Sequence, residues 1–280
     1  MAKQRIVFQG EAGANSHIAC LEMYPDAEVI PQPTFEHCFQ AVAAGEAKLG
    51  MIPIENSLAG RVADIHHLLP TSDLSIVAEY FLPVHHQLLA IPGARIEDLE
   101  VVQSHVHALG QCRKIIRELG LSAEVAADTA GSARFVAELR DPRRAAIAPR
   151  LAAETYGLEI LREDVEDETH NTTRFVVLSR EAKRPSPGNG LIITSFIFRV
   201  RNVPAALYKA LGGFATNGVN MVKLESYVDA GFNQAQFYAE VVGHPEQGPV
   251  KNAFEELAFF SHEVERLGVY PAHPFRFRST

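Results

Sequence analysis

The sequence predicts an α/β protein with two domains, and three observations carry that prediction. The chain has 280 residues, more than one domain of ~100 to 200 residues usually holds. Short β-rich runs alternate with helical patterns over the first part of the chain, an order typical of a largely parallel sheet covered by helices. The stretch EAKRPSPGNG at 181–190 is rich in proline and glycine, as interdomain linkers are. We therefore expect domains at 1–182 and 191–280, joined by a linker at 183–190.

The first region contains seven expected strands, where apolar and β-branched residues run together. Thr34 is a candidate N-cap for one helix, and Ser104 for another that Gly120 stops. About 180 residues with several strand groups leave room for two lobes, and ligands of such sheets bind at the carboxyl ends of strands. The expected strands lie at 5–8, 49–52, 74–79, 86–91, 101–102, 145–148 and 174–178.

The second region follows the order strand, helix, strand, strand, helix, strand. This βαββαβ order predicts a ferredoxin-like sandwich. Pro204 is expected at the first position of the first helix. So small a module is more often regulatory than catalytic, although a fold does not specify a function. The expected strands lie at 191–200, 219–229, 234–242 and 263–270, and the expected helices at 204–216 and 247–260.

Composition and charge exclude several classes of function. Lys and Arg number 26 and Asp and Glu number 34, which gives a formal charge of −8, and no window is dense in basic residues. A nucleic-acid partner is therefore not expected. No apolar run approaches the ~20 residues of a spanning helix, and no secretory signal is readable, so we expect no membrane association. Cys20, Cys38 and Cys112 are widely spaced, which predicts buried free thiols and a cytoplasmic location.

The first of four stretches at strand-to-helix junctions is QGEAGANSH at 9–17. Its two glycines permit a tight turn, and Asn15 or Ser16 opens a helix whose free N–H groups can hold a carboxylate. The stretch lacks the third glycine of a dinucleotide-binding fingerprint and the lysine of a P-loop, so nucleotide binding is poorly supported. A plain capped turn explains the spacing equally well.

The second stretch is PIENSLAG at 53–60, directly after an expected strand. Its three consecutive polar side chains, Glu55, Asn56 and Ser57, are bounded by apolar residues. An ordinary solvent loop does not need such flanks, so we interpret the run as the lining of a site. A turn that feeds a helix remains the alternative.

The third stretch is SHVHALGQC at 104–112. Ser104 and Gln111 lie seven residues apart, which places them on one face of a helix, two turns and ~10 Å apart. Two polar groups on an otherwise apolar face could grip a small ligand. On pattern alone, a capping Ser104 and a solvated Gln111 are the favoured interpretation.

The fourth stretch is THNTTRFVVL at 169–178. Residues of a strand alternate between its faces, so Thr173 and Phe175 point one way while Thr172 and Arg174 point the other. A regular strand cannot present Thr173 and Arg174 to the same ligand. The high β-propensity of threonine is a sufficient alternative explanation for the two threonines.

Twelve histidines raise the question of a metal, and their spacing argues against one. The adjacent pairs at 66–67 and 85–86 and the alternate pair at 105 and 107 lack the i, i+4 spacing of a helical zinc motif, and no cysteine pair joins them. We expect no catalytic metal. A nucleophile elbow is also absent, and Cys112 lies on an apolar helical pattern where a thiol is usually inert.

Together and in this order, the four stretches resemble the prephenate dehydratase family, over essentially the whole chain. The resemblance implies an α/β catalytic region with two lobes and a cleft between them, like type II periplasmic binding proteins, followed by an ACT domain. It places the catalytic threonine of the T-R-F motif at Thr173 and implies no cofactor. The first stretch departs from the family pattern, because Glu11 replaces a proline. The substrate-binding residues implied are Ser16, Glu55, Asn56, Ser57, Ser104, Gln111, Thr172, Arg174 and Phe175.

The reaction of that family suits a site without a cofactor. Loss of water and carbon dioxide from prephenate aromatises its ring and yields phenylpyruvate, a step of phenylalanine biosynthesis. The enzyme must hold two carboxylates and help hydroxide to leave. By the resemblance, Thr173 is the candidate donor to the leaving hydroxyl.

The second region resembles an ACT domain, whose family version binds L-phenylalanine at a subunit interface as a feedback inhibitor. A homodimer or homotetramer is therefore expected. Two signatures depart from the family: AALY replaces Gly-Ala-Leu-Val at 205–208, and ESYV replaces Glu-Ser-Arg-Pro at 225–228. A non-catalytic two-lobed sensor of a small anion or amino acid remains the alternative function. The effector-binding residues implied are Ala206, Leu207, Asn217, Gly218, Asn220, Glu225 and Ser226.

Overall fold

The computed structural model describes residues 3–62, 65–188, 190–228 and 235–277. The chain divides into two compact units, Met1–Val62 with Tyr80–Phe175 and Ala63–Glu79 with Val176–Thr280. Two of the three divisions along the chain fall inside strands, in β5 (Ser75–Pro83) and in β11 (Thr172–Ser179). The second unit thus includes residues 63–79 and 176–182, which the sequence assigns to the first domain. The expected domain boundaries, 1–182 and 191–280, stay a prediction. The predicted strand ends at 229 and 234 lie outside the described residues.

The first sheet of the first unit is built on β1. This strand runs parallel to both β2 and β3, with Val7 opposite Ile30 and Gly50. β11 lies beside β3, and β5 lies beside β11. Thr34 caps α2 as expected, because its Oγ1 accepts from the His37 N–H at 3.3 Å. The elements are β1 (Arg5–Gln9), α1 (Asn15–Met23), β2 (Glu28–Gln32), α2 (Phe35–Ala44), β3 (Leu49–Asn56) and β4 (Gly60–Arg61).

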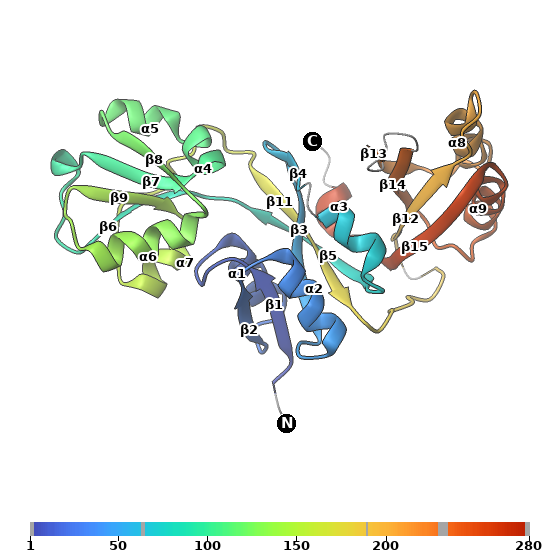
Figure 1. Ribbon diagram of the computed structural model, residues 1–280, viewed down its shortest axis with the longest axis horizontal. Coiled ribbons are helices and arrows are strands. Elements are labelled where there is room, and N and C mark those ends of the chain that lie inside the picture. The colour runs from blue at the N-terminus through green and yellow to red at the C-terminus, as the bar shows by residue number, and fades with distance from the viewer. Residues whose placement is uncertain (1–2, 63–64, 189, 229–234, 278–280) are drawn as a thin grey trace. The chain divides into compact units, whose positions relative to one another are not determined.

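The second sheet of this unit has the order β10-β6-β9-β7-β8. Helices α4 and α5 cover one face, and α6 and α7 cover the other (Figure 1). Adjacent residues of a strand point to opposite faces, so Leu88 packs into the α4–α5 core and Leu89 into the α6–α7 core. The elements are β6 (Gln87–Ala90), η2 (Ile96–Asp98), β7 (Val101–His105), α4 (Val106–Gln111), α5 (Arg113–Glu118), β8 (Ser122–Ala126), α6 (Thr129–Leu139), β9 (Arg144–Ala148), α7 (Arg150–Tyr156) and β10 (Glu159–Arg162).

The helix predicted from a Ser104 cap is wrong in two respects. Ser104 is a fully buried residue of β7, because the inward alternation of Val102 continues through it. His105 is the N-cap instead, and its Nδ1 accepts from the His107 N–H at 3.3 Å. The helical segment also breaks at Cys112, whose φ of −122° and ψ of 32° separate α4 from α5.

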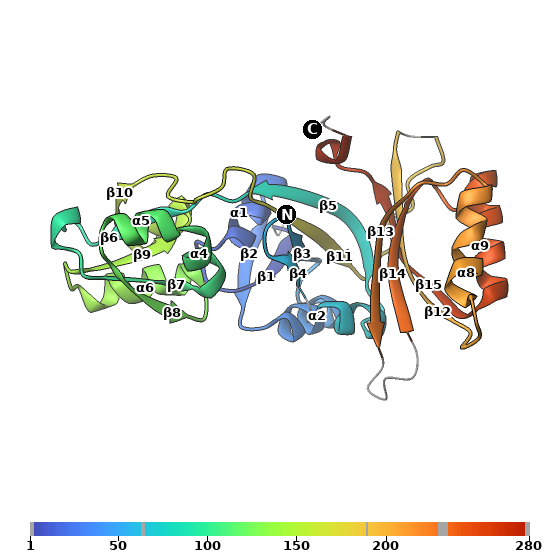
Figure 2. The same cartoon turned by 90° about the horizontal axis from the view of Figure 1, so that it is seen from above.

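The second unit contains the predicted βαββαβ order. Its strands pair antiparallel in the order β13-β14-β12-β15, and Gly268 of β15 lies opposite Ile76 of β5. Helices α8 and α9 pack on one face of this sheet (Figure 2). The elements are α3 (Ile65–Leu68), η1 (Leu69–Thr71), β12 (Ile192–Val200), α8 (Ala206–Thr216), β13 (Met221–Val228), β14 (Ala235–Val242), α9 (Gly248–Phe260), β15 (Ser261–Pro271) and η3 (Pro274–Phe277).

The α/β class is confirmed, whereas the predicted start of the first helix of this unit is wrong. α8 begins at Ala206, and its N-cap Ala205 adopts the left-handed region at φ 61°. Pro204 therefore precedes the helix in a turn that the Ala206 N–H closes onto the Val203 carbonyl at 3.2 Å. Among the described residues, no helix is long and apolar enough to cross a membrane.

Candidate active site

Asn56 and Thr173 meet where β3 and β11 run side by side. The Asn56 Nδ2 donates to the Thr173 Oγ1 at 2.9 Å. The Asn56 Oδ1 accepts from the backbone N–H groups of Leu58 and Ala59 at 3.0 and 2.8 Å. Backbone N–H groups can only donate, so they fix which end of the amide faces Thr173. The Thr173 oxygen is thus an acceptor toward Asn56, and its own proton can be donated to another group.

Glu55 and Arg174 form the corresponding pair one residue along each strand. The Arg174 Nη1 lies 2.9 Å from the Glu55 Oε1, and the guanidinium stands over the Phe81 ring. This pairing confirms that Thr173 and Arg174 point to opposite faces. Arg174 is 2% exposed and Phe175 is 1% exposed. In this conformation both side chains lie in the core, and their predicted contacts with substrate stay a prediction.

Ser57 connects the end of β3 by hydrogen bonds to the residues that directly precede Thr173. Its Oγ donates to the His170 carbonyl at 2.8 Å and accepts from the Thr172 N–H at 2.9 Å. After Asn56 the chain turns into the short strand β4, so the alternative of a turn that feeds a helix is wrong. The polar run at 55–57 holds the segment that carries Thr173.

The structure separates Ser104 from Gln111. Ser104 donates to the Ile147 carbonyl at 2.5 Å, which joins β7 to β9, and it is fully buried. The predicted contact of Ser104 with a ligand stays a prediction. Gln111 is not solvated either, because its Oε1 accepts from the Asn171 Nδ2 at 2.9 Å and contacts the His86 Nε2 at 3.0 Å. Sequence reasoning missed Asn171 and His86, although Asn171 lies inside the fourth stretch.

The loop between β1 and α1 holds the predicted anion position. α1 opens at Asn15 as predicted, and its N-cap Ala14 has no side chain that could cap the first turn. Ser16 is 9% exposed in that turn. His17 accepts from the Gly13 N–H at 3.0 Å, and burial lowers the pKa of His17. This neutral, uncapped helix start can accept a carboxylate.

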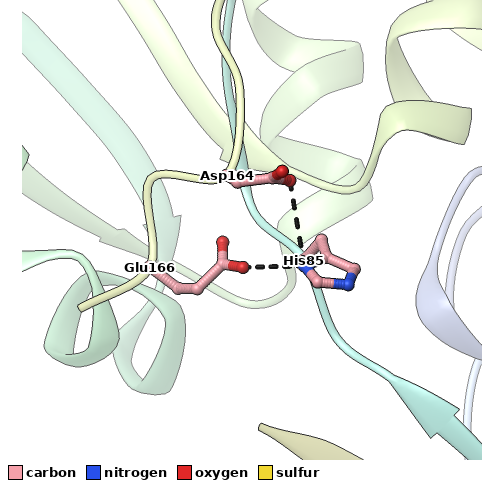
Figure 3. Close-up of side chains that lie close together, drawn as sticks. All are labelled: His85, Asp164 and Glu166. Carbon is pink, nitrogen blue, oxygen red and sulfur yellow. Dashed lines mark hydrogen bonds and ion pairs between the residues drawn. The ribbon is translucent and has the colours of Figure 1, made fainter. Parts of the chain in front are cut away.

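One group of metal-ligating side chains occurs among the described residues, at His85, Asp164 and Glu166. The His85 Nδ1 lies 2.8 Å from the Glu166 Oε1 and 3.8 Å from the Asp164 Oδ1 (Figure 3). The second Glu166 oxygen accepts from the His86 N–H at 2.9 Å. These bonds join two segments far apart in sequence, which accounts for the group structurally. The expectation of no catalytic metal stays a prediction.

The three cysteines are buried free thiols, as predicted. Burial raises the pKa of all three and that of Cys38 to about 12. A thiol with so high a pKa is a poor nucleophile near neutral pH. The cysteines are therefore structural residues rather than candidates for catalysis.

Comparison with known proteins decides the family. The profile of the prephenate dehydratase family matches residues 6–183. The chain belongs to the prephenate dehydratase family. The family predicted from the four stretches is thereby confirmed, and the chain is an enzyme of the dehydratase type, a carbon–oxygen lyase.

Several known proteins of the prephenate dehydratase family resemble this chain over nearly its whole length. The bifunctional N-acyl-homoserine lactone acylase/prephenate dehydratase of Komagataeibacter europaeus is 52% identical over 273 residues, which cover 97% of each chain. Arogenate dehydratase/prephenate dehydratase 6 of Arabidopsis thaliana is 38% identical and covers 95% of this chain and 68% of that protein. The crystal structure of the Arthrobacter aurescens prephenate dehydratase in complex with L-Phe has a TM-score of 0.88 at 30% identity, covering 96% and 90% of the two chains.

Proposed function

We propose that this enzyme converts prephenate to phenylpyruvate, carbon dioxide and water, with Thr173 as the proton donor. The observation that carries the proposal is the direction of the Asn56–Thr173 hydrogen bond. The ring C–O bond and the bond to the ring carboxylate break, and the electron pair of the latter completes the aromatic ring. The leaving hydroxide takes the Thr173 proton and departs as water, and solvent restores the proton to the threonine. Interactions that strengthen as negative charge develops on the leaving oxygen accelerate such a step.

The substrate carboxylates need positive partners, and the uncapped start of α1 beside Ser16 supports one such position. We assign the other substrate contacts to polar groups at the junction of β3, β11 and α4, namely Asn56 and Gln111, and leave out Thr172 because strand alternation points it away from Thr173. This arrangement corresponds to the catalytic region with two lobes that the resemblance implies. No step of the proposed reaction calls on a metal or a cofactor.

The decisive experiment is incubation of the purified full chain with prephenate while phenylpyruvate is measured. We expect product formation that continues over many turnovers. The non-catalytic sensor makes the opposite prediction: prephenate binds, but no phenylpyruvate appears. Absence of product both with and without L-phenylalanine would contradict the proposal.

We further propose that the C-terminal unit is an ACT domain that binds L-phenylalanine. Its βαββαβ order supports this assignment, as does the relative whose structure contains L-Phe. Near the end of α8, Asn217 donates to the Gly213 carbonyl at 2.8 Å and to Glu256 at 3.1 Å. Calorimetric titration with L-phenylalanine tests the binding, and sedimentation tests the expected homodimer or homotetramer. The cytoplasmic location stays a prediction.

An acylase activity is a second candidate function, because the 52% identical relative carries both names. The matching experiment measures release of homoserine lactone from an N-acyl-homoserine lactone. Arogenate should be assayed as a substrate in the same way, because the plant relative is named for it. Loss of water and carbon dioxide from arogenate would yield phenylalanine directly.

A further inference from the structure

Five side chains form a continuous line of hydrogen bonds in the first unit, and we call them the polar line. The Asn56 Nδ2 reaches the Thr173 Oγ1 at 2.9 Å and the Asn171 Oδ1 at 2.7 Å. The line continues from the Asn171 Nδ2 to the Gln111 Oε1 at 2.9 Å and from there to the His86 Nε2 at 3.0 Å. Asn171 and His86 are 2% and 3% exposed, so water cannot readily replace these partners.

The backbone fixes the direction of every bond in the polar line. The N–H groups of Leu58 and Ala59 hold the Asn56 Oδ1, so the Asn56 amide must present its NH₂ group to Asn171 and Thr173. Asn171 then has to accept with its oxygen, which turns its own NH₂ group toward Gln111. The Gln111 oxygen accepts from Asn171, and the same oxygen faces His86.

At the far end of the polar line, the His86 imidazole must therefore donate a hydrogen bond to the Gln111 oxygen. A carbonyl oxygen cannot donate, so the His86 Nε2 must carry the proton. The other ring nitrogen, Nδ1, is buried and has no hydrogen-bond partner among the described residues. A proton on Nδ1 would leave an unpaired buried donor. Burial also lowers the pKa of His86, which favours the neutral ring.

We propose that Asn171 and His86 are positioning residues for Thr173, with His86 held as the Nε2–H tautomer. Asn171 occupies one hydrogen of the Asn56 NH₂ group and so directs the other to the Thr173 oxygen. His86 and Gln111 keep Asn171 in the orientation that can accept. The structural part needs only the geometry, whereas the catalytic part rests on the proposed function.

The structural part is tested by ¹⁵N NMR of the full chain at a pH where the ring is neutral. A His86→Gln sample identifies the His86 signals among those of the twelve histidines by their disappearance. We expect a protonated Nε2 and an unprotonated Nδ1. An Nδ1–H tautomer would overturn the inference, and this measurement needs no substrate.

The catalytic part is tested by a matched pair of variants. His86→Gln retains an N–H near the position of Nε2, whereas His86→Leu removes it. We expect kcat of His86→Gln within about 3-fold of wild type and kcat of His86→Leu about 3- to 10-fold lower, which is the usual effect of one buried hydrogen bond. KM should change less than about 2-fold in both variants.

Asn171→Leu extends this test to the middle of the polar line, with the same expected loss in kcat. Equal kcat in His86→Gln and His86→Leu, or a change confined to thermal stability, would remove the positioning role. If wild type makes no phenylpyruvate, the proposed function fails, while the tautomer still decides the structural part. If a leucine variant does not fold, the wild-type tautomer keeps the inference testable.

Discussion

The Thr173 hydroxyl is the group of the Asn56–Thr173 pair that can donate to a ligand, because both hydrogens of the Asn56 NH₂ group are already donated, to Thr173 and to Asn171. Thr173→Val keeps the shape of the side chain and removes the hydroxyl. We expect kcat to fall by ~10² to 10⁴, the usual contribution of a positioned acid, with little change in the affinity for prephenate. Thr173→Ser, which retains the hydroxyl, is the control and should keep most of the activity. Wild-type turnover by a folded Thr173→Val enzyme would remove Thr173 from the mechanism.

Local sequence patterns predict the placement of some residues of the site but not of others. Strand alternation placed Thr173 and Arg174 on opposite faces, because that property is local to the chain. The role of Asn171 depends instead on Asn56 and Gln111, which lie 115 and 60 residues away in the sequence. Such a contact exists only after folding, so no local pattern predicts it.

At the scale of elements, the loop between β1 and α1 is packed against α7. A Cβ at Gly13, whose φ is +89°, would lie 2.7 Å from the Ala152 Cα. Gly13→Ala should therefore destabilise the fold through both backbone strain and a steric clash. Gly93→Ala is the matched control, because Gly93 has φ +84° and nothing within 4 Å of the added Cβ. In urea unfolding we expect a clearly larger loss for Gly13→Ala; equal losses would show that the loop moves away without cost.

Element types followed from local patterns, whereas some element ends did not. The βαββαβ order of the second unit was readable because its apolar runs and glycine turns are local signals. The end of β7 was misread because a buried serine hydroxyl, paired here with the Ile147 carbonyl, looks like a helix cap in sequence. Pro204 was misplaced because a left-handed Ala205 lies between it and α8, a conformation that few alanines adopt.

At the scale of the whole chain, the last described segment anchors the second unit. Arg276 of η3 bridges Glu79 and Glu240 at 2.7 and 2.6 Å, and both carboxylates are fully buried. Removing one partner of a buried ionic group leaves uncompensated charge, typically at a cost of ~3 to 5 kcal/mol. Arg276→Met should lower the free energy of unfolding by about that amount. Arg5→Met, which breaks the half-exposed pair with Glu28, should change it by less than about 1 kcal/mol; a similar small effect at Arg276 would contradict the argument.

Regulation must also be tested on the whole chain, because residues 63–79 group with the C-terminal unit. Truncation before β12 would expose Ile76 and Val77, which are 1% and 2% exposed, and would confuse loss of regulation with loss of folding. Asn220 is exposed directly before β13, and its amide can both donate to the carboxylate of phenylalanine and accept from its ammonium group.

Asn220→Ala should therefore raise the L-phenylalanine concentration needed for inhibition by about 10- to 150-fold, the usual effect of losing a hydrogen bond to a charged group, and leave uninhibited kcat unchanged. Gln40→Ala also removes an exposed side-chain amide, from the surface of α2 and outside the proposed effector residues, and should stay sensitive. If both variants respond to phenylalanine as wild type does, the effector binds elsewhere. The replacement of Arg-Pro by Tyr227 and Val228 would then indicate that this unit serves assembly rather than feedback.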